Sequence, residues 1–278
     1  MGTNAMSFRW RAIRVICLRE LRSLFMGLGI YIVTTLVLLA CAAGVLSFVG
    51  AVSDAGLRTS AEPLLGDFVY AIGALTLYIG ILATIAVSRE RDRGTLEVLF
   101  YGPVDSTSYV MAKFLEHLAA FAIVMVVTLA AFGIISAITG LIFTGGLVRA
   151  GILSLFFAST AISFGIFLSS ITLKMRNSVV LFILIMVGLG LFSLLEAYLG
   201  LMLGEASAFV EYGRVVVGLI GRVLNWISPI AYYRRGIEAA RIGDLRMLVI
   251  SVLSPIIYTS GLLWLAAATF TKKGVRAQ

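Results

Sequence analysis

Residues 88–114, SRERDRGTLEVLFYGPVDSTSYVMAKF, form the longest polar stretch in the first two thirds of an otherwise apolar chain. Five charged residues, Arg89 to Arg93, follow directly on an apolar run. Thr95 is of a type that caps helices, and Gly102-Pro103 is a pair that ends them. We therefore expect a short helix whose apolar side is formed by Leu96, Leu99 and Phe100. Outside a membrane, such a side needs a partner to cover it.

The composition indicates a protein that crosses a membrane several times. Of the 278 residues, 60% are hydrophobic and 13% charged, and the mean hydropathy is +1.06. The net charge of +8 needs no nucleic acid partner, because cytoplasmic flanks of membrane spans collect Lys and Arg. Cys17 and Cys41 fit neither a metal spacing nor a disulfide framework.

Long apolar segments predict an all-α fold with six transmembrane helices, since about 20 helical residues cross a hydrocarbon core of about 30 Å. The expected spans are residues 30–49, 68–87, 118–143, 150–173, 179–199 and 247–270. The alternative for the first is a cleaved signal peptide, because Leu38-Leu39-Ala40-Cys41 resembles a lipoprotein cleavage site. That apolar run is long and starts late for a signal peptide.

Two further segments predict helices at the membrane surface. In residues 8–25 an apolar face (Trp10, Ile13, Cys17, Leu21, Leu24) lies opposite three arginines (Arg11, Arg19, Arg22), which is typical of an interfacial helix; the alternative is a basic flank that orients the first span. Residues 200–246 are expected to form an outer loop with short helices. Within it, residues 215–224 are too short to cross and are expected to lie on the outer surface or dip into it.

The distribution of Lys and Arg favours six spans with both termini inside. Most of the 22 basic residues fall in the predicted inner segments, although six arginines lie in the outer loop 200–246. A seventh crossing would place the basic C-terminal residues Lys272, Lys273 and Arg276 outside.

The opening stretch resembles the cytoplasmic signature of type 2 ATP-binding-cassette (ABC) transporter permeases, E-x-x-x-G-T-L-E followed by Pro and A/G-K-x-L. The matching residues are Glu90, Gly94-Thr95-Leu96-Glu97, Pro103 and Lys113-Phe114-Leu115, with Ala112 where glycine is usual. The resemblance implies a coupling helix in residues 88–114 that docks into a separate ATPase. The residues it assigns to ATPase coupling are Arg89, Glu90, Arg93, Gly94, Thr95, Leu96, Glu97, Leu99, Phe100, Pro103 and Lys113, and the inner turn of Lys174, Arg176 and Asn177 is a secondary contact.

A second match lies before the last span. Residues 225–232, NWISPIAY, resemble the family's N-P-x-x-Y segment, with Ser228 in place of asparagine. The resemblance implies outer helices that help to close the exit, which makes Asn225, Pro229 and Tyr232 candidate gate or pathway residues. The alternative is an aromatic belt with arginines reaching to lipid headgroups. Glu196, an acidic residue within a span, either reaches water or has a role in the substrate pathway or the gate.

Motifs for catalysis are absent, so the chain is not expected to be an enzyme or to bind a metal or cofactor itself. It has one histidine, His117, expected to be a satisfied interfacial residue, and no G-x-x-x-x-G-K-[ST] phosphate loop. The resemblance implies an exporter in which ATP and Mg²⁺ bind two cytosolic ATPase subunits. It also implies a second permease, identical or related, and a prokaryotic inner membrane with both termini cytoplasmic. The alternatives are an ion-gradient-driven transporter or channel, and a non-transporting anchor for an ATPase.

Overall fold

The computed structural model describes residues 2–55, 63–94, 105–172, 174–201, 208–242 and 245–273. Within these ranges the chain is helical apart from short turns, which confirms the predicted all-α class. The helices are α1 (Gly2–Met26), α2 (Leu28–Ala55), α3 (Pro63–Asp92), α5 (Ser106–Thr139), α6 (Gly145–Ile171), α7 (Met175–Leu201), α8 (Ala208–Ile227), α9 (Pro229–Ile242) and α10 (Leu245–Lys273).

Six helices are long and apolar enough to cross a membrane, which confirms the predicted six spans. They are α2, α3, α5, α6, α7 and α10. The third span stops short of the predicted residue 143, because Gly140 adopts a left-handed conformation with φ of 70° and ends α5 at Thr139. At its other end α5 begins at Ser106, so about three helical turns precede the expected start of this span.

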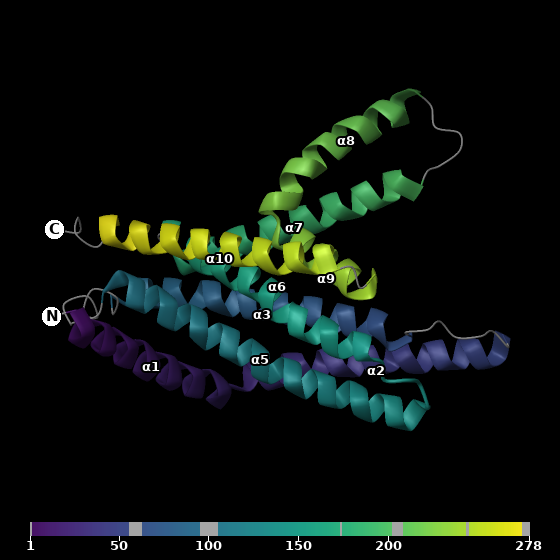
Figure 1. The fold of residues 1–278 in the computed structure, drawn as a ribbon, viewed down its shortest axis with the longest axis horizontal. Helices are drawn as coiled ribbons and strands as arrows, with labels where there is room; N and C mark the ends of the chain where they lie inside the picture. Colours follow the sequence, from purple (N-terminus) through teal and green to yellow (C-terminus); the bar gives the residue numbers. More distant parts are fainter. Residues whose placement is uncertain are drawn as a thin grey trace.

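Figure 1 shows both chain termini at one end of the long helices, called the terminal end below. The end of α3, the start of α5 and the turn between α6 and α7 lie at the same end. The opposite end is called the far end. The common position of the termini agrees with an even number of crossings, and which side of a membrane they occupy stays a prediction.

Helices α3 and α6 form the centre of the bundle. In the most apolar window of α6, 78% of the residues are buried, against 17% for α2 and for α7. Small residues allow α3 and α6 to approach closely: a Cβ on Gly165 would lie 2.7 Å from the carbonyl oxygen of Gly80. Hydroxyl groups within α6 bond to the helix's own carbonyls, as Ser163 Oγ does to the Thr160 oxygen at 3.0 Å. Small residues thus allow the fourth span to pack closely against α3, and its hydroxyl groups are satisfied within the helix.

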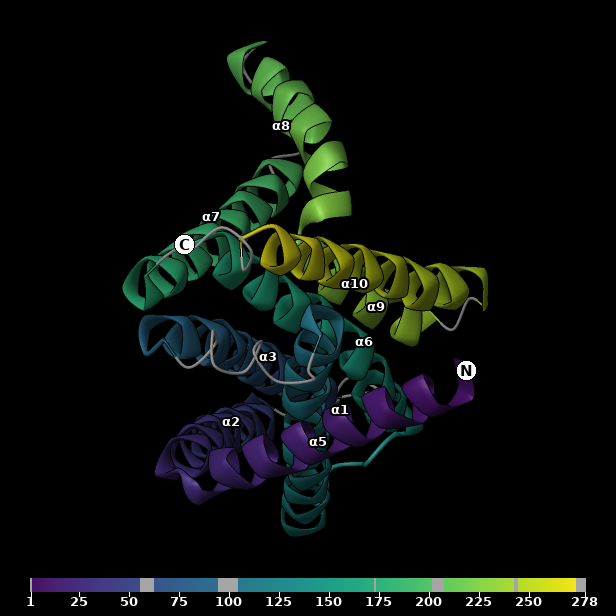
Figure 2. The same cartoon turned by 90° about the vertical axis from the view of Figure 1, so that its left-hand side faces the viewer.

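Helix α1 crosses α5 obliquely at the terminal end (Figure 2). The side chains of the predicted apolar face are half-buried at Ile13, Cys17, Leu21 and Leu24. Trp10 is an exception, with 64% exposed, and the arginines of the opposite face are exposed as expected. The position of α1 at a membrane interface stays a prediction.

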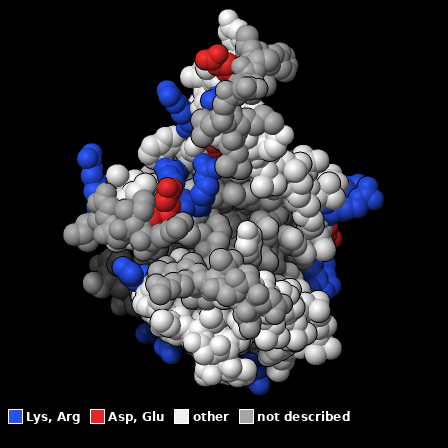
Figure 3. Space-filling model, turned by 90° about the vertical axis from the view of Figure 1, so that its right-hand side faces the viewer, with Lys and Arg blue, Asp and Glu red and all other residues white. Residues whose placement is uncertain are grey.

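The predicted outer loop contains two helices that are longer than expected. Helix α8 has 20 residues and α9 has 14, and the pair is bent by 89° at Ser228. The bend falls where Pro229 starts α9, since proline lacks an N–H and suits the first helical position. Figure 1 shows α8 running from the far end of α7 towards the middle of the bundle, and α9 running out again to the start of α10. A pair with this bend is either a broken span or a re-entrant loop. The charges visible at the far end are mainly basic (Figure 3).

We expect Gly165→Ala to destabilise the protein by about 1–3 kcal/mol, because the new methyl group would meet the backbone of α3. Gly133→Ala in α5 is the matched control, since a Cβ there has no neighbour within 4 Å. Thermal unfolding of the purified proteins in detergent measures both changes. Equal melting temperatures for the two variants would contradict close packing of α3 against α6.

Candidate functional site at the terminal end

Six of the predicted coupling residues lie outside the described residues. They are Thr95, Leu96, Glu97, Leu99, Phe100 and Pro103. The short docking helix therefore stays a prediction. On its N-terminal side the chain leaves α3 through Gly94, whose φ of 69° favours glycine over other residues. On its C-terminal side α5 starts directly after Asp105.

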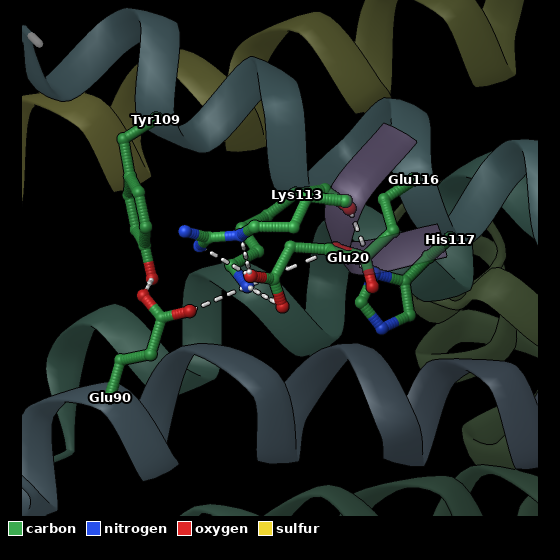
Figure 4. Close-up of polar contacts among 7 residues, drawn as sticks. Glu20, Glu90, Tyr109, Lys113, Glu116 and His117 are labelled. Atoms are coloured by element: carbon green, nitrogen blue, oxygen red, sulfur yellow. Dashed lines mark hydrogen bonds and ion pairs between the residues drawn. The ribbon is translucent and has the colours of Figure 1, made fainter. Parts of the chain in front are cut away.

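A buried lysine joins three helices at the terminal end (Figure 4). Lys113 of α5 is only 1% exposed. Its Nζ lies 2.6 Å from Glu90 Oε1 of α3, 3.2 Å from Glu20 Oε2 of α1 and 3.9 Å from Glu116 Oε2 of α5. One desolvated cation thus holds carboxylates from three helices together.

Neighbouring groups complete this buried network. Tyr109 donates a hydrogen bond to Glu90 Oε2 at 2.6 Å, and His117 Nδ1 lies 2.8 Å from the Lys113 carbonyl oxygen. Burial alone would raise the pKa of Glu20, but Lys113 and Arg19 outweigh it and lower that pKa overall. Among the described residues, no group of His, Cys, Asp and Glu could hold a metal ion. The chemistry of the network is therefore that of an internal ion cluster centred on Lys113.

Arg91, one residue after Glu90, binds the end of α6. Its guanidinium donates to the carbonyl oxygens of Ser169 and Ser170 at 3.2 Å each, and to that of Thr172. The last carbonyls of a helix lack intrahelical partners and carry partial negative charge, so an arginine stabilises them. Phe270 of α10 lies against the same guanidinium, 5.2 Å from ring centroid to Cζ.

Asp92, the last residue of α3, binds the start of α7. Its Oδ2 accepts a hydrogen bond from the Met175 backbone N–H at 2.9 Å, as an acidic residue does at a helix N-terminus. Asp92 shares a surface depression with the residues of the predicted secondary contact, Lys174, Arg176 and Asn177. The α6–α7 turn and the end of α3 therefore form one surface.

Hydroxyl groups behind Arg91 and Asp92 join the same helices. Ser88 of α3 lies 2.6 Å from Ser169 Oγ of α6 and donates to Ser178 Oγ of α7 at 2.7 Å. All three serines are buried. Satisfied hydroxyl bonds between helices resist separation where no water is available.

The remaining predicted coupling residues, Arg89 and Arg93, are exposed. They line a cavity between α1, α2, α3 and α5, together with Glu20, Glu90 and Lys113. These predicted coupling residues therefore differ in their surroundings. Glu90 and Lys113 form an internal ion pair, whereas the side chains of Arg89 and Arg93 are exposed in the cavity wall.

The predicted gate residues lie at the bend between α8 and α9. Glu196 Oε2 of α7 is 3.3 Å from Arg234 Nη2, which also lies 3.5 Å from Asn225 Oδ1. Tyr232 donates to the Trp226 carbonyl at 2.7 Å, and Pro229 begins α9. The structure therefore brings Glu196 and Asn225 together around one arginine, while the Glu196–Arg234 pair stays partly exposed and contributes little to stability.

Sequence reasoning missed several residues of the terminal end: Glu20, Arg91, Asp92 and Tyr109. A signal for Glu20 exists, because it is the only acidic residue before Asp54 in a segment with five arginines. The roles of Arg91 and Asp92 carry no such signal, since any charged residue after a span resembles a solvated helix end.

We expect Lys113→Met to destabilise the protein by about 3–5 kcal/mol, because three carboxylates would lose their buried cation. Lys174→Met is the matched control, since Lys174 is exposed in the α6–α7 turn. Thermal unfolding in detergent compares the two. A melting temperature of the Lys113 variant equal to that of the control would show that the cluster does not hold the helices together.

The comparison with known proteins identifies a family. A search of curated proteins found no matching sequence. Residues 18–275, nearly the whole chain, match the family described as ABC-2 family transporter protein. This match agrees with the six apolar helices and with the motif at Gly94. The chain belongs to the ABC-2 transporter family and is a multi-pass membrane permease component of an ABC transporter.

Proposed function

We propose that this chain forms the substrate pathway of an ATP-driven exporter and is driven by a separate cytosolic ATPase. Membership of the family implies partnership with an ABC ATPase. The observation that carries the proposal is that the end of α3 is bonded to the turn between α6 and α7 at the terminal end. Arg91 and Asp92 connect the helix that precedes residues 95–104 to the turn between α6 and α7. A partner that docks on this end would therefore act on α3, α6 and α7 together.

The proposed cycle places the chemistry in the partner. Two ATPase subunits bind ATP and Mg²⁺, close on one another and push on the coupling helix around Gly94 to Phe100. Leu96, Leu99 and Phe100 fill the groove of the ATPase, and Glu97 pairs with a basic residue there. Lys174, Arg176 and Asn177 make the second contact, and a second permease, identical or related, completes the pathway.

Sidedness and exit follow from the same proposal. The terminal end faces the cytoplasm of a prokaryotic cell, which is supported by the arginines that precede the first span. The α8–α9 pair then lies at the outer mouth, where Glu196, Asn225, Arg234 and Tyr232 are the proposed gate residues.

We expect Glu97→Arg to abolish ATP turnover that depends on the permease while membrane insertion stays intact, because the reversed charge would repel the docking groove. ATP hydrolysis by the purified complex measures the effect. Glu211→Arg, an exposed site on α8, is the matched control. Unchanged turnover for the Glu97 variant would rule out coupling through this residue.

We expect Arg91→Ala to lower ATP turnover of the complex roughly tenfold, because α6 would lose the charged hydrogen bonds that tie it to α3. The ATPase should still copurify, since Arg91 faces inward. Arg149→Ala, exposed at the opposite end of α6, should change neither property. Full turnover in the Arg91 variant would mean that the partner acts on α6 by another route.

Substrate flux distinguishes the proposal from its alternatives. ATP-dependent flux into inverted vesicles that resists ionophores supports an ATP-driven exporter. Flux that ionophores abolish supports an ion-gradient-driven transporter, and an ATPase that binds without any flux supports a membrane anchor.

A further inference from the structure

A cavity of about 550 Å³ opens beside the Lys113 cluster, between α1, α2, α3 and α5. Its walls change character along α3. Arg93 and Arg89 line it near the end of the helix, whereas Ile85, Leu82 and Tyr78 line it deeper in the bundle. Leu24 of α1 and Ile30 of α2 add to the apolar part. The cavity is therefore amphipathic, with its charged part at the terminal end.

The stretch of α3 that lines the cavity is about as long as one leaflet of a bilayer is thick. Tyr78 and Asp92, the last residue of α3, are separated by about 21 Å, at about 1.5 Å per residue, and Arg93 follows directly. Half of a bilayer that includes its headgroups measures about 20–22 Å. A lipid of the leaflet at the terminal end would thus reach from the arginines to the deep apolar wall.

The two arginines offer a site for phosphate. Arg93 directly follows α3, and its backbone N–H bonds to the Arg89 carbonyl oxygen at 3.1 Å, so it continues the last helical turn and the two arginines, four residues apart, lie on one side of it. No ion pair or side-chain hydrogen bond joins either guanidinium to another described residue, and both side chains are exposed. Guanidinium groups bind phosphate oxygens through paired, charge-assisted hydrogen bonds.

The carboxylates beside them offer a site for an amine. The side chains of Glu20 and Glu90 keep 24% and 20% of their surface exposed although both contact Lys113. Glu116, also in the cavity wall, is 3% exposed and its Oε2 has no hydrogen-bond partner. Glu20 also pairs with Arg19, at 2.6 Å. The three carboxylates of the wall are balanced by three cations, Arg89, Arg93 and Lys113, and this mixture of charges suits a zwitterionic headgroup better than one that is only anionic.

We propose that this cavity binds an aminophospholipid, a lipid with both a phosphate and a primary amine in its headgroup. Arg89 and Arg93 hold the phosphate, Glu20 and Glu90 accept hydrogen bonds from the ammonium, and one acyl chain lies along Leu82 and Ile85. This assigns the two arginines to a lipid rather than to the ATPase, and it holds whether or not the chain is an exporter.

Native mass spectrometry of the purified, delipidated protein with added lipids tests the proposal. Phosphatidylethanolamine should bind with one copy per chain, more tightly than phosphatidylcholine, whose amine has no N–H, and more tightly than anionic phosphatidylglycerol. Arg89→Gln with Arg93→Gln should weaken this binding roughly tenfold or more, because two charge-assisted contacts are lost. Arg11→Gln with Arg14→Gln is the matched control, since these exposed arginines of α1 line a different depression.

Further outcomes decide against the proposal. Equal or tighter binding of phosphatidylglycerol would overturn it, as would unchanged phosphatidylethanolamine binding in the Arg89, Arg93 double variant. Arg89→Lys with Arg93→Lys keeps the charge and should restore part of the binding, and no recovery in a normally folded lysine variant would also count against a phosphate site. If the glutamine variant kept its lipid but no longer bound the ATPase, both arginines would be assigned to ATPase binding and not to a lipid.

Discussion

The contacts of Lys113 constrain the terminal end more than any others. A cation that is 1% exposed costs several kcal/mol to desolvate unless carboxylates surround it. Glu20, Glu90 and Glu116 come from α1, α3 and α5, so each of these helices must keep its position for the cluster to form. This requirement fixes α1 on α5, although most of the side chains along α1 are half-buried or exposed.

Three charged residues in the last turn of α3 each contact a different neighbouring helix. Successive residues of a helix point about 100° apart, so Glu90, Arg91 and Asp92 cannot face the same helix. Glu90 faces Lys113 of α5, Arg91 caps α6, and Asp92 caps α7. Because this turn leads directly into Gly94 and residues 95–104, a force applied there reaches the ends of three helices through short polar contacts.

Part of this arrangement could be predicted from the sequence. Charge-free runs predict the spans, because a chain in lipid must bond its own backbone and forms helices. The motif at Gly94 located the terminal end. The pairing of Glu20 with Lys113 could not be predicted, since 93 residues separate them and only packing of α1 on α5 brings them together. The end of α5 was also missed, because Gly140 lies inside a long apolar run where nothing marks a left-handed residue.

At the far end, α9 packs against the same two central helices, α3 and α6. Tyr233 of α9 donates a hydrogen bond to the Val69 carbonyl of α3. A Cβ on Gly236 would lie 1.5 Å from Phe157 of α6, so only glycine allows α9 to pack this closely. The α8–α9 pair is therefore attached to α3 and α6, whose terminal ends are tied by Arg91. Since these two helices are in backbone contact at Gly80 and Gly165, they form a stiff connection between the predicted docking segment and the predicted gate.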